Sequence, residues 1–164
     1  MPEKPAREEL EQRIRELENA ESENRHELEA LRESEAMFRF LTESMSDIIW
    51  TVDMDFNTTY VSPSIENVLG FTPEERKNQS PEEMVTPESL KSIKKLLNKE
   101  YIKDKLRSKD RERSITAMTE YYMKSGGTLW LENHVRWIRD EKGKIIGIHG
   151  ISRDITARRQ AEKA

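Results

Sequence analysis

Side chains able to do chemistry are present throughout this 164-residue chain, but their types and spacing do not form a catalytic or metal-binding set. The three histidines, His26, His134 and His149, are not spaced as metal ligands on one element. No cysteine is present, which excludes disulfides, thiolate metal sites and a cysteine nucleophile. Carboxylates are plentiful but belong to solvated heptads, and no glycine-rich loop of the kind that binds phosphate occurs. We therefore expect a module that is not an enzyme.

One amide interrupts an otherwise apolar strand face. In the strand-like run 128–138 the odd positions are the more apolar set, and alternation directs them toward the core: Leu129, Leu131, Asn133, Val135 and Trp137. Asn133 either hydrogen-bonds to neighbouring backbone or faces a cavity and contacts a ligand. Buried polar groups nearly always find partners within the protein, which favours the first explanation.

Composition restricts the classes of protein to which the chain can belong. Hydrophobic residues make up 34% and charged residues 37%, so part of the chain is expected to be non-globular. The net charge of −4 gives no reason to expect a nucleic-acid partner. No apolar run approaches the roughly 20 residues of a membrane span, and no signal-peptide pattern is present. We expect a cytoplasmic protein without a membrane segment.

The N-terminal region has the pattern of a coiled coil. Residues 7–35 contain neither Gly nor Pro and are rich in helix formers. Apolar residues recur at alternating four- and three-residue steps and form a heptad seam: Leu10, Ile14, Leu17, Leu28, Leu31 and Phe38. A parallel homodimer would match Arg13 with Glu18, and Glu27 with Arg32, across the two chains. The alternative is a single solvated helix, and the polar core positions Glu21 and Asn24 would weaken a coil or fix its register.

The rest of the chain alternates strands and helices in an order typical of an α+β domain. Strand patterns cover residues 47–53, 56–62, 116–123, 128–138 and 145–155. Helical stretches occupy residues 63–110, the longest over about 87–105. The segments "KSGGT" and "RDEKGK" carry hairpin patterns between the last three strands. This order predicts one antiparallel sheet with helices.

Four stretches resemble the PAS domain, the sensory module of bacterial histidine kinases and cyclic-dinucleotide signalling proteins: "SEAMFRFLTESMSDIIWTVD", "YVSPSIENVLGFTPEE", "KSGGTLWLENHVRWIRDEKGKIIG" and "GISRDIT". The resemblance covers about Ser34 to Thr156. It implies a five-stranded antiparallel sheet with helices on one face and a pocket between them, preceded by a coiled-coil helix. The boundaries expected are residues 1–36 for the coiled coil, 37–156 for the sensor domain and 157–164 for the start of an output helix.

The resemblance also implies a set of residues that line the pocket: Trp50, Val52, Tyr121, Asn133 and Ser152. Of these, Asn133 is the best single candidate for a ligand contact. The alternative is that these side chains fill the core, since many domains of this family hold no ligand.

Two cofactors of the family are disfavoured by the residues present, and the cofactor remains unknown. Flavin photochemistry of the light-oxygen-voltage type needs a cysteine, and haem ligation uses a histidine on the long helix, where residues 87–110 contain none. Non-covalent flavin or a small organic acid is compatible with the sequence. Residues 89–113 look long for the family and carry ten Lys or Arg against four Asp or Glu. A solvated helix face explains this charge more simply than a bound anionic ligand.

The closing motif "GISRDIT" indicates how a signal would leave the domain. In similar proteins Asp-Ile-Thr leads from the last strand into another helix, which would connect to a C-terminal output domain. Asp154 would hydrogen-bond the junction backbone, and Thr156 would serve as N-cap of the helix that follows.

We therefore interpret the chain as a sensory module that binds a small ligand and relays its state through helices. The alternatives are a ligand-free dimerisation and transmission module and a protein-interaction platform on the exposed sheet face. On that outer face, a four-residue loop after Arg139 would place His134 opposite His149. A plain packed pair of imidazoles is favoured there over a pH-sensitive pair. The apolar part of this face is expected to be covered by residues 38–45.

Overall fold

The computed structural model describes residues 3–106 and 113–164 and divides into two compact units. The first unit extends to Leu41 and the second comprises residues 42–164. Helix α1 (Glu3–Ser44) forms the first unit, and its last turn belongs to the second. None of the helices formed by the described residues combines the length and apolar character needed to cross a bilayer.

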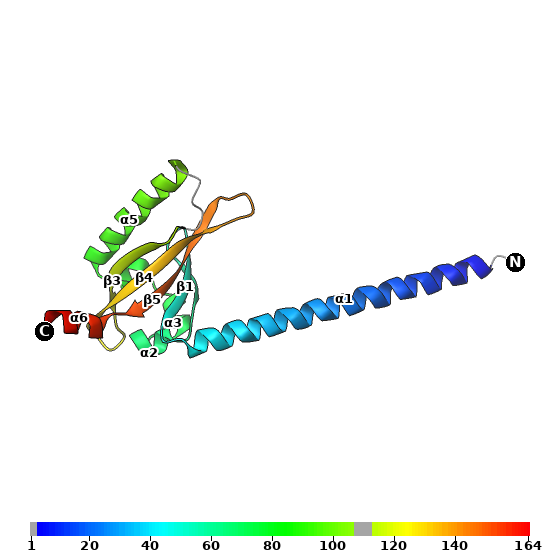
Figure 1. Ribbon diagram of the computed structural model, residues 1–164, viewed down its shortest axis with the longest axis horizontal. Helices are drawn as coiled ribbons and strands as arrows, with labels where there is room; N and C mark the ends of the chain where they lie inside the picture. The colour runs from blue at the N-terminus through cyan, green and yellow to red at the C-terminus, as the bar shows by residue number, and fades with distance from the viewer. Residues whose placement is uncertain (1–2, 107–112) are drawn as a thin grey trace. The chain divides into compact units, whose positions relative to one another are not determined.

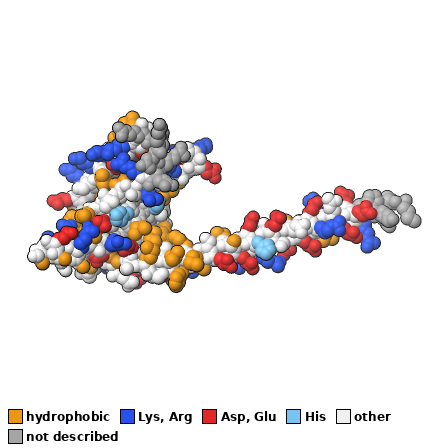
Figure 2. Space-filling model, viewed as in Figure 1, with side chains coloured by type: hydrophobic (Ala, Val, Ile, Leu, Met, Phe, Trp, Pro, Cys, Tyr) orange, Lys and Arg blue, Asp and Glu red, His pale blue; other side chains and the backbone are white. Residues whose placement is uncertain are grey.

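Helix α1 is a highly charged helix with an apolar stripe. Figure 2 shows acidic and basic side chains interspersed along it, and Arg–Glu pairs four residues apart, such as Arg25–Glu21 at 3.2 Å, support it locally. The six seam residues expose between 47% and 65% of their surface in the single chain: Leu10, Ile14, Leu17, Leu28, Leu31 and Phe38. A stripe of this kind is suited to pairing with another helix. Parallel pairing with a second copy stays a prediction.

The second unit is built on a five-stranded antiparallel sheet, which confirms the predicted α+β fold class. Its strands are β1 (Ile48–Asp53), β2 (Thr58–Val61), β3 (Ile115–Tyr122), β4 (Thr128–Arg139) and β5 (Ile145–Asp154). Their order across the sheet is β2-β1-β5-β4-β3. Figure 1 shows α5 lying along the sheet and α6 following the end of β5.

Short helices and one long helix connect β2 to β3: α2 (Ile65–Leu69), α3 (Pro73–Lys77), α4 (Pro81–Met84) and α5 (Pro87–Leu106). Gly70 ends α2 with a left-handed φ of 87°, a conformation that glycine adopts readily. Thr72 and Glu75 form a reciprocal capping box that begins α3, with Pro73 at its first position. Helix α6 (Thr156–Lys163) follows β5.

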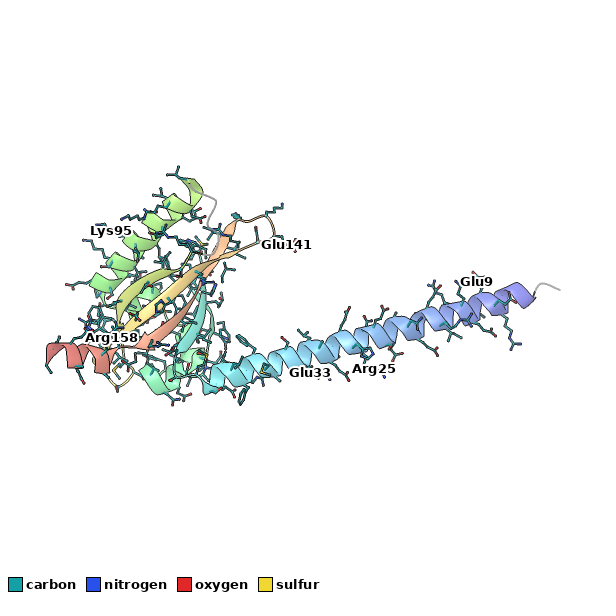
Figure 3. All side chains as sticks on the ribbon, viewed as in Figure 1. Glu9, Arg25, Glu33, Lys95, Glu141 and Arg158 are labelled. Atoms are coloured by element: carbon teal, nitrogen blue, oxygen red, sulfur yellow. The ribbon has the colours of Figure 1, made fainter. Side chains whose placement is uncertain are left out.

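Helix α5 turns one apolar face inward and its lysines outward. Leu97 is buried, whereas Lys91, Lys94, Lys95 and Lys99 are exposed, and Figure 3 shows Lys95 pointing away from the domain. Near the end of the helix, Asp104 pairs with Arg139 of β4. The exposed lysines fit the expected solvated face, although residues 107–112 of the basic stretch lie outside the described residues.

The core consists of two hydrophobic clusters with one aromatic side chain against both. The first contains Ile48, Val61, Ile65, Leu69 and Leu131. The second contains Leu97, Ile115, Val135 and Ile148. Trp50 of β1 packs against both clusters. The two clusters therefore meet at the indole in the middle of the sheet.

The register of the β4–β5 hairpin differs from the prediction. His134 lies opposite Ile151, and His149 lies opposite Arg136, so the predicted pairing of His134 with His149 is wrong. The turn is tighter than expected, because the Asp140 N–H donates to the Lys144 carbonyl and Gly143 takes a left-handed φ of 81°. An irregularity next to Arg139 then shifts the pairing by one residue. The two imidazoles are therefore diagonal neighbours and not a directly opposed pair.

Candidate ligand-binding cavity

A cavity of about 120 Å³ lies between the inner face of the sheet and the helices that cover it. An apolar cavity of ~150 Å³ is known to hold a benzene molecule, so this somewhat smaller space is comparable in size to a single small ring or a short acyl chain. Pockets for drug-sized ligands are larger, roughly 300–1,000 Å³. A three-ring flavin would therefore require the helices to move outward.

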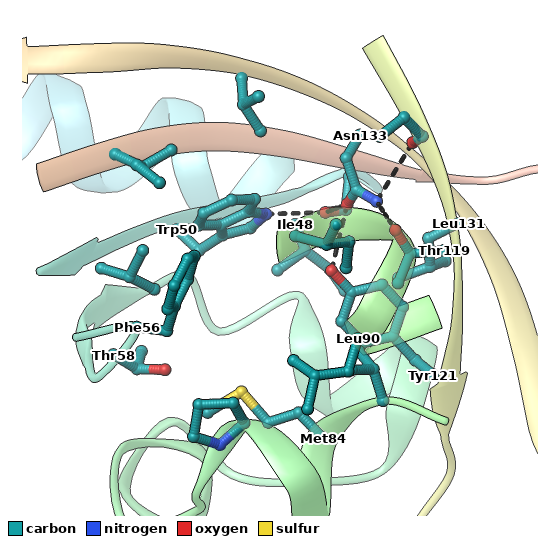
Figure 4. Close-up of a pocket in the computed structure, with 18 of the residues that line it drawn as sticks. Ile48, Trp50, Phe56, Thr58, Met84, Leu90, Thr119, Tyr121, Leu131 and Asn133 are labelled. Carbon is teal, nitrogen blue, oxygen red and sulfur yellow. Dashed lines mark hydrogen bonds between the residues drawn. The ribbon is translucent and has the colours of Figure 1, made fainter. Parts of the chain in front are cut away.

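The walls of the cavity are mainly apolar and come from both layers of the domain. The sheet contributes residues such as Ile48, Ile115 and Val135, and the helices contribute Ile65, Leu69, Met84, Leu90 and Leu97. Figure 4 shows Met84 and Leu90 facing the aromatic side chains of the sheet. Phe56, in the β1–β2 turn, also lines the cavity and has a positive φ of 65°, which is uncommon for a bulky residue.

All five residues predicted to line the pocket do border this cavity: Trp50, Val52, Tyr121, Asn133 and Ser152. They come from four strands. The pairing explains their common direction, because Trp50 lies opposite Gly150, Asn133 opposite Ser152, and Tyr121 on the same face of β3. That any of them contacts a ligand stays a prediction.

Four of these side chains form a continuous hydrogen-bond network, drawn in Figure 4. The Trp50 Nε1–H donates to Ser152 Oγ at 2.7 Å, and the Ser152 hydroxyl donates to Asn133 Oδ1. The Tyr121 hydroxyl donates to the same Asn133 oxygen at 3.3 Å. The network therefore connects β1, β5, β4 and β3 across the inner face of the sheet.

Asn133 is the centre of this network and is fully hydrogen-bonded by the protein. It is 3% exposed. Its Nδ2 donates to the Ala117 carbonyl at 3.3 Å and to Thr119 Oγ1 at 3.0 Å, while its Oδ1 accepts the two hydroxyls described above. An asparagine amide offers two donors and two acceptor lone pairs, and all four are used here. A ligand would have to displace one of these partners to bind the amide directly.

Of the lining residues that sequence reasoning missed, the most informative is the buried cation Arg76 of α3. It is 4% exposed. Phe71 and Arg76 occupy the two positions that flank the capping box, where a pair of apolar residues often packs together. The guanidinium carbon lies 5.5 Å from the centre of the Phe71 ring and 5.7 Å from that of Tyr121. The capping-box pattern "FTPEER" places this position next to Phe71, but an arginine there gives no sign of its burial.

Burial shifts the pKa values of the two polar groups that meet here. Burial raises the pKa of the Tyr121 hydroxyl, and the nearby charge of Arg76 opposes this rise. Burial lowers the pKa of the Arg76 guanidinium. A guanidinium is not deprotonated in proteins, so Arg76 keeps its positive charge at neutral pH. The cavity therefore combines apolar walls with one fixed positive charge.

Asp154 fixes the junction between the end of β5 and the start of helix α6. Its Oδ1 accepts the Thr156 N–H at 2.8 Å and the Thr156 hydroxyl at 2.6 Å. Helix α6 begins at Thr156, and Ile155 occupies the N-cap position. The prediction of Thr156 as N-cap is therefore wrong, because the carboxylate of Asp154 satisfies the first helical N–H. The predicted contact of Asp154 with the junction backbone is present.

Ion pairs connect the ends of β4 and β5 to their surroundings at this exit. Arg158 of α6 donates to Glu132 of β4 at 3.0 Å, and this hydrogen bond lowers the pKa of the Glu132 carboxyl. Arg153 of β5 pairs with Asp47 at 2.8 Å. The Arg159 guanidinium lies 4.3 Å from the centre of the Trp130 ring. Helix α6 is thus attached to the outer face of β4 as well as to β5.

No group of three or more His, Cys, Asp or Glu side chains in residues 3–106 and 113–164 is arranged to hold a metal ion. Helix α5 contains no histidine.

Residues 42–160 match the family described as the PAS fold. The match spans most of the chain and begins where the second compact unit begins. The chain belongs to the PAS family. No curated protein sequence is similar enough to match it.

Solved structures of PAS domains have a similar fold. The PAS domain of an HTR-like protein from Haloarcula marismortui is 20% identical with a TM-score of 0.62, over 80% of this chain and 99% of that one. A sensory box histidine kinase/response regulator from Burkholderia thailandensis is 17% identical with a TM-score of 0.55, over 77% of this chain and 89% of that one.

A third similar structure is an RNA-binding light-oxygen-voltage receptor, 17% identical with a TM-score of 0.58 over 75% of this chain. The PAS chain described here spans only 33% of that receptor's length. At these levels of identity the similarities show the fold alone.

Proposed function

We propose that this PAS chain is the sensory module of a signal-transduction protein. A small ligand occupies the cavity, and its presence changes the position of helix α6, which leads to an output domain. Helix α1 pairs with a second copy in a parallel coiled coil. The module itself has no catalytic role, and the parent protein is cytoplasmic. The name of one similar structure, a sensory box histidine kinase/response regulator, supports an output of this type.

The observation that carries this proposal is that one strand connects the cavity to the exit helix. Ser152 and Asp154 lie two residues apart on β5, so their side chains emerge on the same face. Ser152 hydrogen-bonds with Trp50 and Asn133 at the cavity. Asp154 holds the first turn of α6. A ligand that changes the partners of Ser152 therefore acts on the strand that positions α6.

A second candidate is a ligand-free module that transmits signals between the helices on either side. The closed hydrogen-bond network favours it, because Asn133 and the indole of Trp50 have protein partners without any ligand. In this case the cavity would be a packing defect in the core, and the network would serve only to fix the register of the strands.

Native mass spectrometry of the freshly purified full chain distinguishes the two candidates. The sensor function predicts a non-covalent mass that disappears when the protein is unfolded. Amide hydrogen exchange is then compared between the protein as purified and the protein refolded without ligand. We expect the exchange of α6 to differ between the two states, with strands β3 and β4 unchanged. Absence of any retained mass, together with identical exchange after soaking in a cell extract's small-molecule fraction, would favour the ligand-free module.

A further inference from the structure

Arg76 is the only charged side chain among the described residues that line the cavity. It belongs to α3, a short helix that otherwise carries its charges outward. Glu74 and Lys77 are exposed and pair with each other at 3.7 Å. Glu75 accepts a hydrogen bond from Lys124 at 2.7 Å and another from the Thr72 N–H. The acidic residues next to Arg76 in sequence are thus engaged elsewhere.

The charge of Arg76 is not matched by a carboxylate in the part of the chain that the structure describes. Its Nη1 donates to Gln79 Oε1 at 2.8 Å, which is a neutral partner. Its other contacts are the faces of Phe71 and Tyr121. A guanidinium carries five N–H donors, and Gln79 accepts one of them. Arg76 therefore keeps unused donors beside the cavity while it is almost completely removed from bulk water.

An unmatched buried charge is unfavourable, and its usual compensation is a hydrogen-bonded ion of opposite sign. Aromatic faces compensate only in part, because they attract a cation without accepting its hydrogen bonds. The planar guanidinium fork is complementary to a carboxylate, which it binds through two parallel hydrogen bonds. An anion that enters the cavity would supply the charged partner that Arg76 lacks among the described residues.

The rest of the cavity restricts what that anion can be. The rest of the lining is mainly apolar and aromatic, with residues such as Trp50, Phe56 and Leu97. A phosphate dianion would bring more negative charge than one arginine neutralises. A monocarboxylate brings one charge, and its apolar body would bury against these walls. The volume of about 120 Å³ limits that body to a single ring or a short chain.

We propose that the cavity binds a small apolar monocarboxylate, with its carboxylate paired to Arg76 and its ring or chain packed against Trp50 and Phe56. This inference rests on the proposed sensor function and names its class of ligand. It does not require displacement of Asn133, because the acid is recognised by donors that the protein leaves unused. The hydrogen-bond network then responds to the body of the ligand, which lies beside Trp50.

Isothermal titration calorimetry of the full chain with benzoate and hexanoate tests the inference. Benzamide and hexanamide serve as uncharged compounds of nearly the same shape. We expect each acid to bind at least about tenfold more tightly than its amide near neutral pH, as for a charge-assisted contact in place of a neutral one. Ala117→Leu, which fills part of the cavity wall, should weaken all four compounds and so locate them.

Variants of Arg76 and Arg136 show whether the preference for acid over amide depends on the charge of Arg76. In Arg76→Gln the preference for acid over amide should fall below about threefold, and Arg76→Lys should be intermediate because it keeps the charge without the planar fork. Arg136→Gln is the matched control, since Arg136 is exposed on the outer face of β4, and it should keep the full preference. The comparison of acid with amide in the wild-type chain decides the question even if Arg76→Gln fails to fold.

Equal binding of acid and amide overturns the inference, and so does a preference that survives in Arg76→Gln. If the amides bind the cavity as well as the acids, the sensor function stands and only the carboxylate is wrong. If none of the four compounds binds, the inference is overturned, and the mass retained in native mass spectrometry decides the sensor function separately.

Discussion

Trp50 lies directly opposite Gly150 across the β1–β5 pair, and its indole occupies the space above the glycine. A Cβ on Gly150 would lie 2.5 Å from Trp50 Cζ2 and 2.9 Å from Val135 Cγ1. Only a residue without a side chain lets the indole lie flat here and direct its N–H to Ser152. The position of the ring that borders both core clusters thus depends on the first residue of "GISRDIT".

Gly150→Ala should therefore move the indole and destabilise the domain. We expect the free energy of unfolding to fall by about 1–3 kcal/mol, the usual cost of overpacking a core. Urea denaturation measures this loss. Trp50→Phe removes the atoms that the new methyl group meets, so Gly150→Ala should cost less in that background. Equal costs in the two backgrounds would show that the clash with the indole is not the cause.

Asn133→Leu should destabilise the domain, because it removes four hydrogen bonds and leaves the hydroxyls of Tyr121 and Ser152 without their acceptor. We expect a loss of about 3 kcal/mol in the free energy of unfolding, since each buried polar group left unpaired is costly. The matched control is Asn98→Leu, at an exposed amide of α5, which should change stability by less than about 0.5 kcal/mol. Similar denaturation midpoints for the two variants would contradict a structural role for Asn133.

His149 should titrate below the usual histidine pKa of 6.5, because partial burial and then the charge of Arg136 lower its pKa. The unfolded chain therefore binds the proton more readily than the folded domain. It follows that the free energy of unfolding decreases as the pH falls below about 6.5. Two-dimensional NMR of the imidazole resonances measures the midpoint in the folded state.

Two variants separate the causes of this shift. Arg136→Gln should raise the His149 midpoint toward 6.5, because the two residues are cross-strand partners. His134→Gln should leave the midpoint unchanged, because His134 lies opposite Ile151 instead. A His149 midpoint that moves in His134→Gln would indicate that the two imidazoles are coupled after all.

Asp154→Ala should free the first turn of α6 while the sheet stays folded. The loss of the contacts to the Thr156 N–H and hydroxyl removes a cap, which is worth about 1 kcal/mol. Amide exchange in α6 should then become roughly fivefold faster, and a full-length fusion should lose the dependence of output on input. Asp140→Ala is the control, because Asp140 accepts the Lys142 and Lys144 N–H groups in a turn away from α6. Normal regulation in the Asp154 variant would contradict the proposed relay.

If α1 pairs with a second copy as proposed, replacing Leu17 and Leu31 by Asp should convert the proposed dimer into monomers in analytical ultracentrifugation. Both side chains belong to the exposed apolar stripe of α1, and buried charges at such positions oppose pairing. The control is the pair Asn19→Asp and Ser22→Asp, which adds the same two charges outside the heptad seam. A dimer that persists in the seam variant would place the main interface elsewhere.

The sequence alone determined where the helices and strands lie and which positions of each strand face the core. Period-two alternation depends only on neighbouring residues, so it assigned Asn133 and its apolar neighbours to the inner face of β4, where Leu131, Asn133 and Val135 are buried. The continuous run of helix formers likewise predicted the long N-terminal helix, which extends without a break to Ser44. These features are local, and the tertiary structure leaves them unchanged.

Only the tertiary structure decided how these elements meet. The turn and the irregularity at Arg139 together move the β4–β5 pairing by two residues from the predicted register, which separates His134 from His149, and this geometry is not specified by composition. The capping of α6 by Asp154 rather than Thr156 depends on the direction in which β5 ends. Arg76 looks like any surface arginine in a charged helix, yet packing against Phe71 and Tyr121 buries it beside the cavity. Burial and pairing depend on residues distant in sequence, and for that reason the charge within the cavity could not be predicted from local pattern.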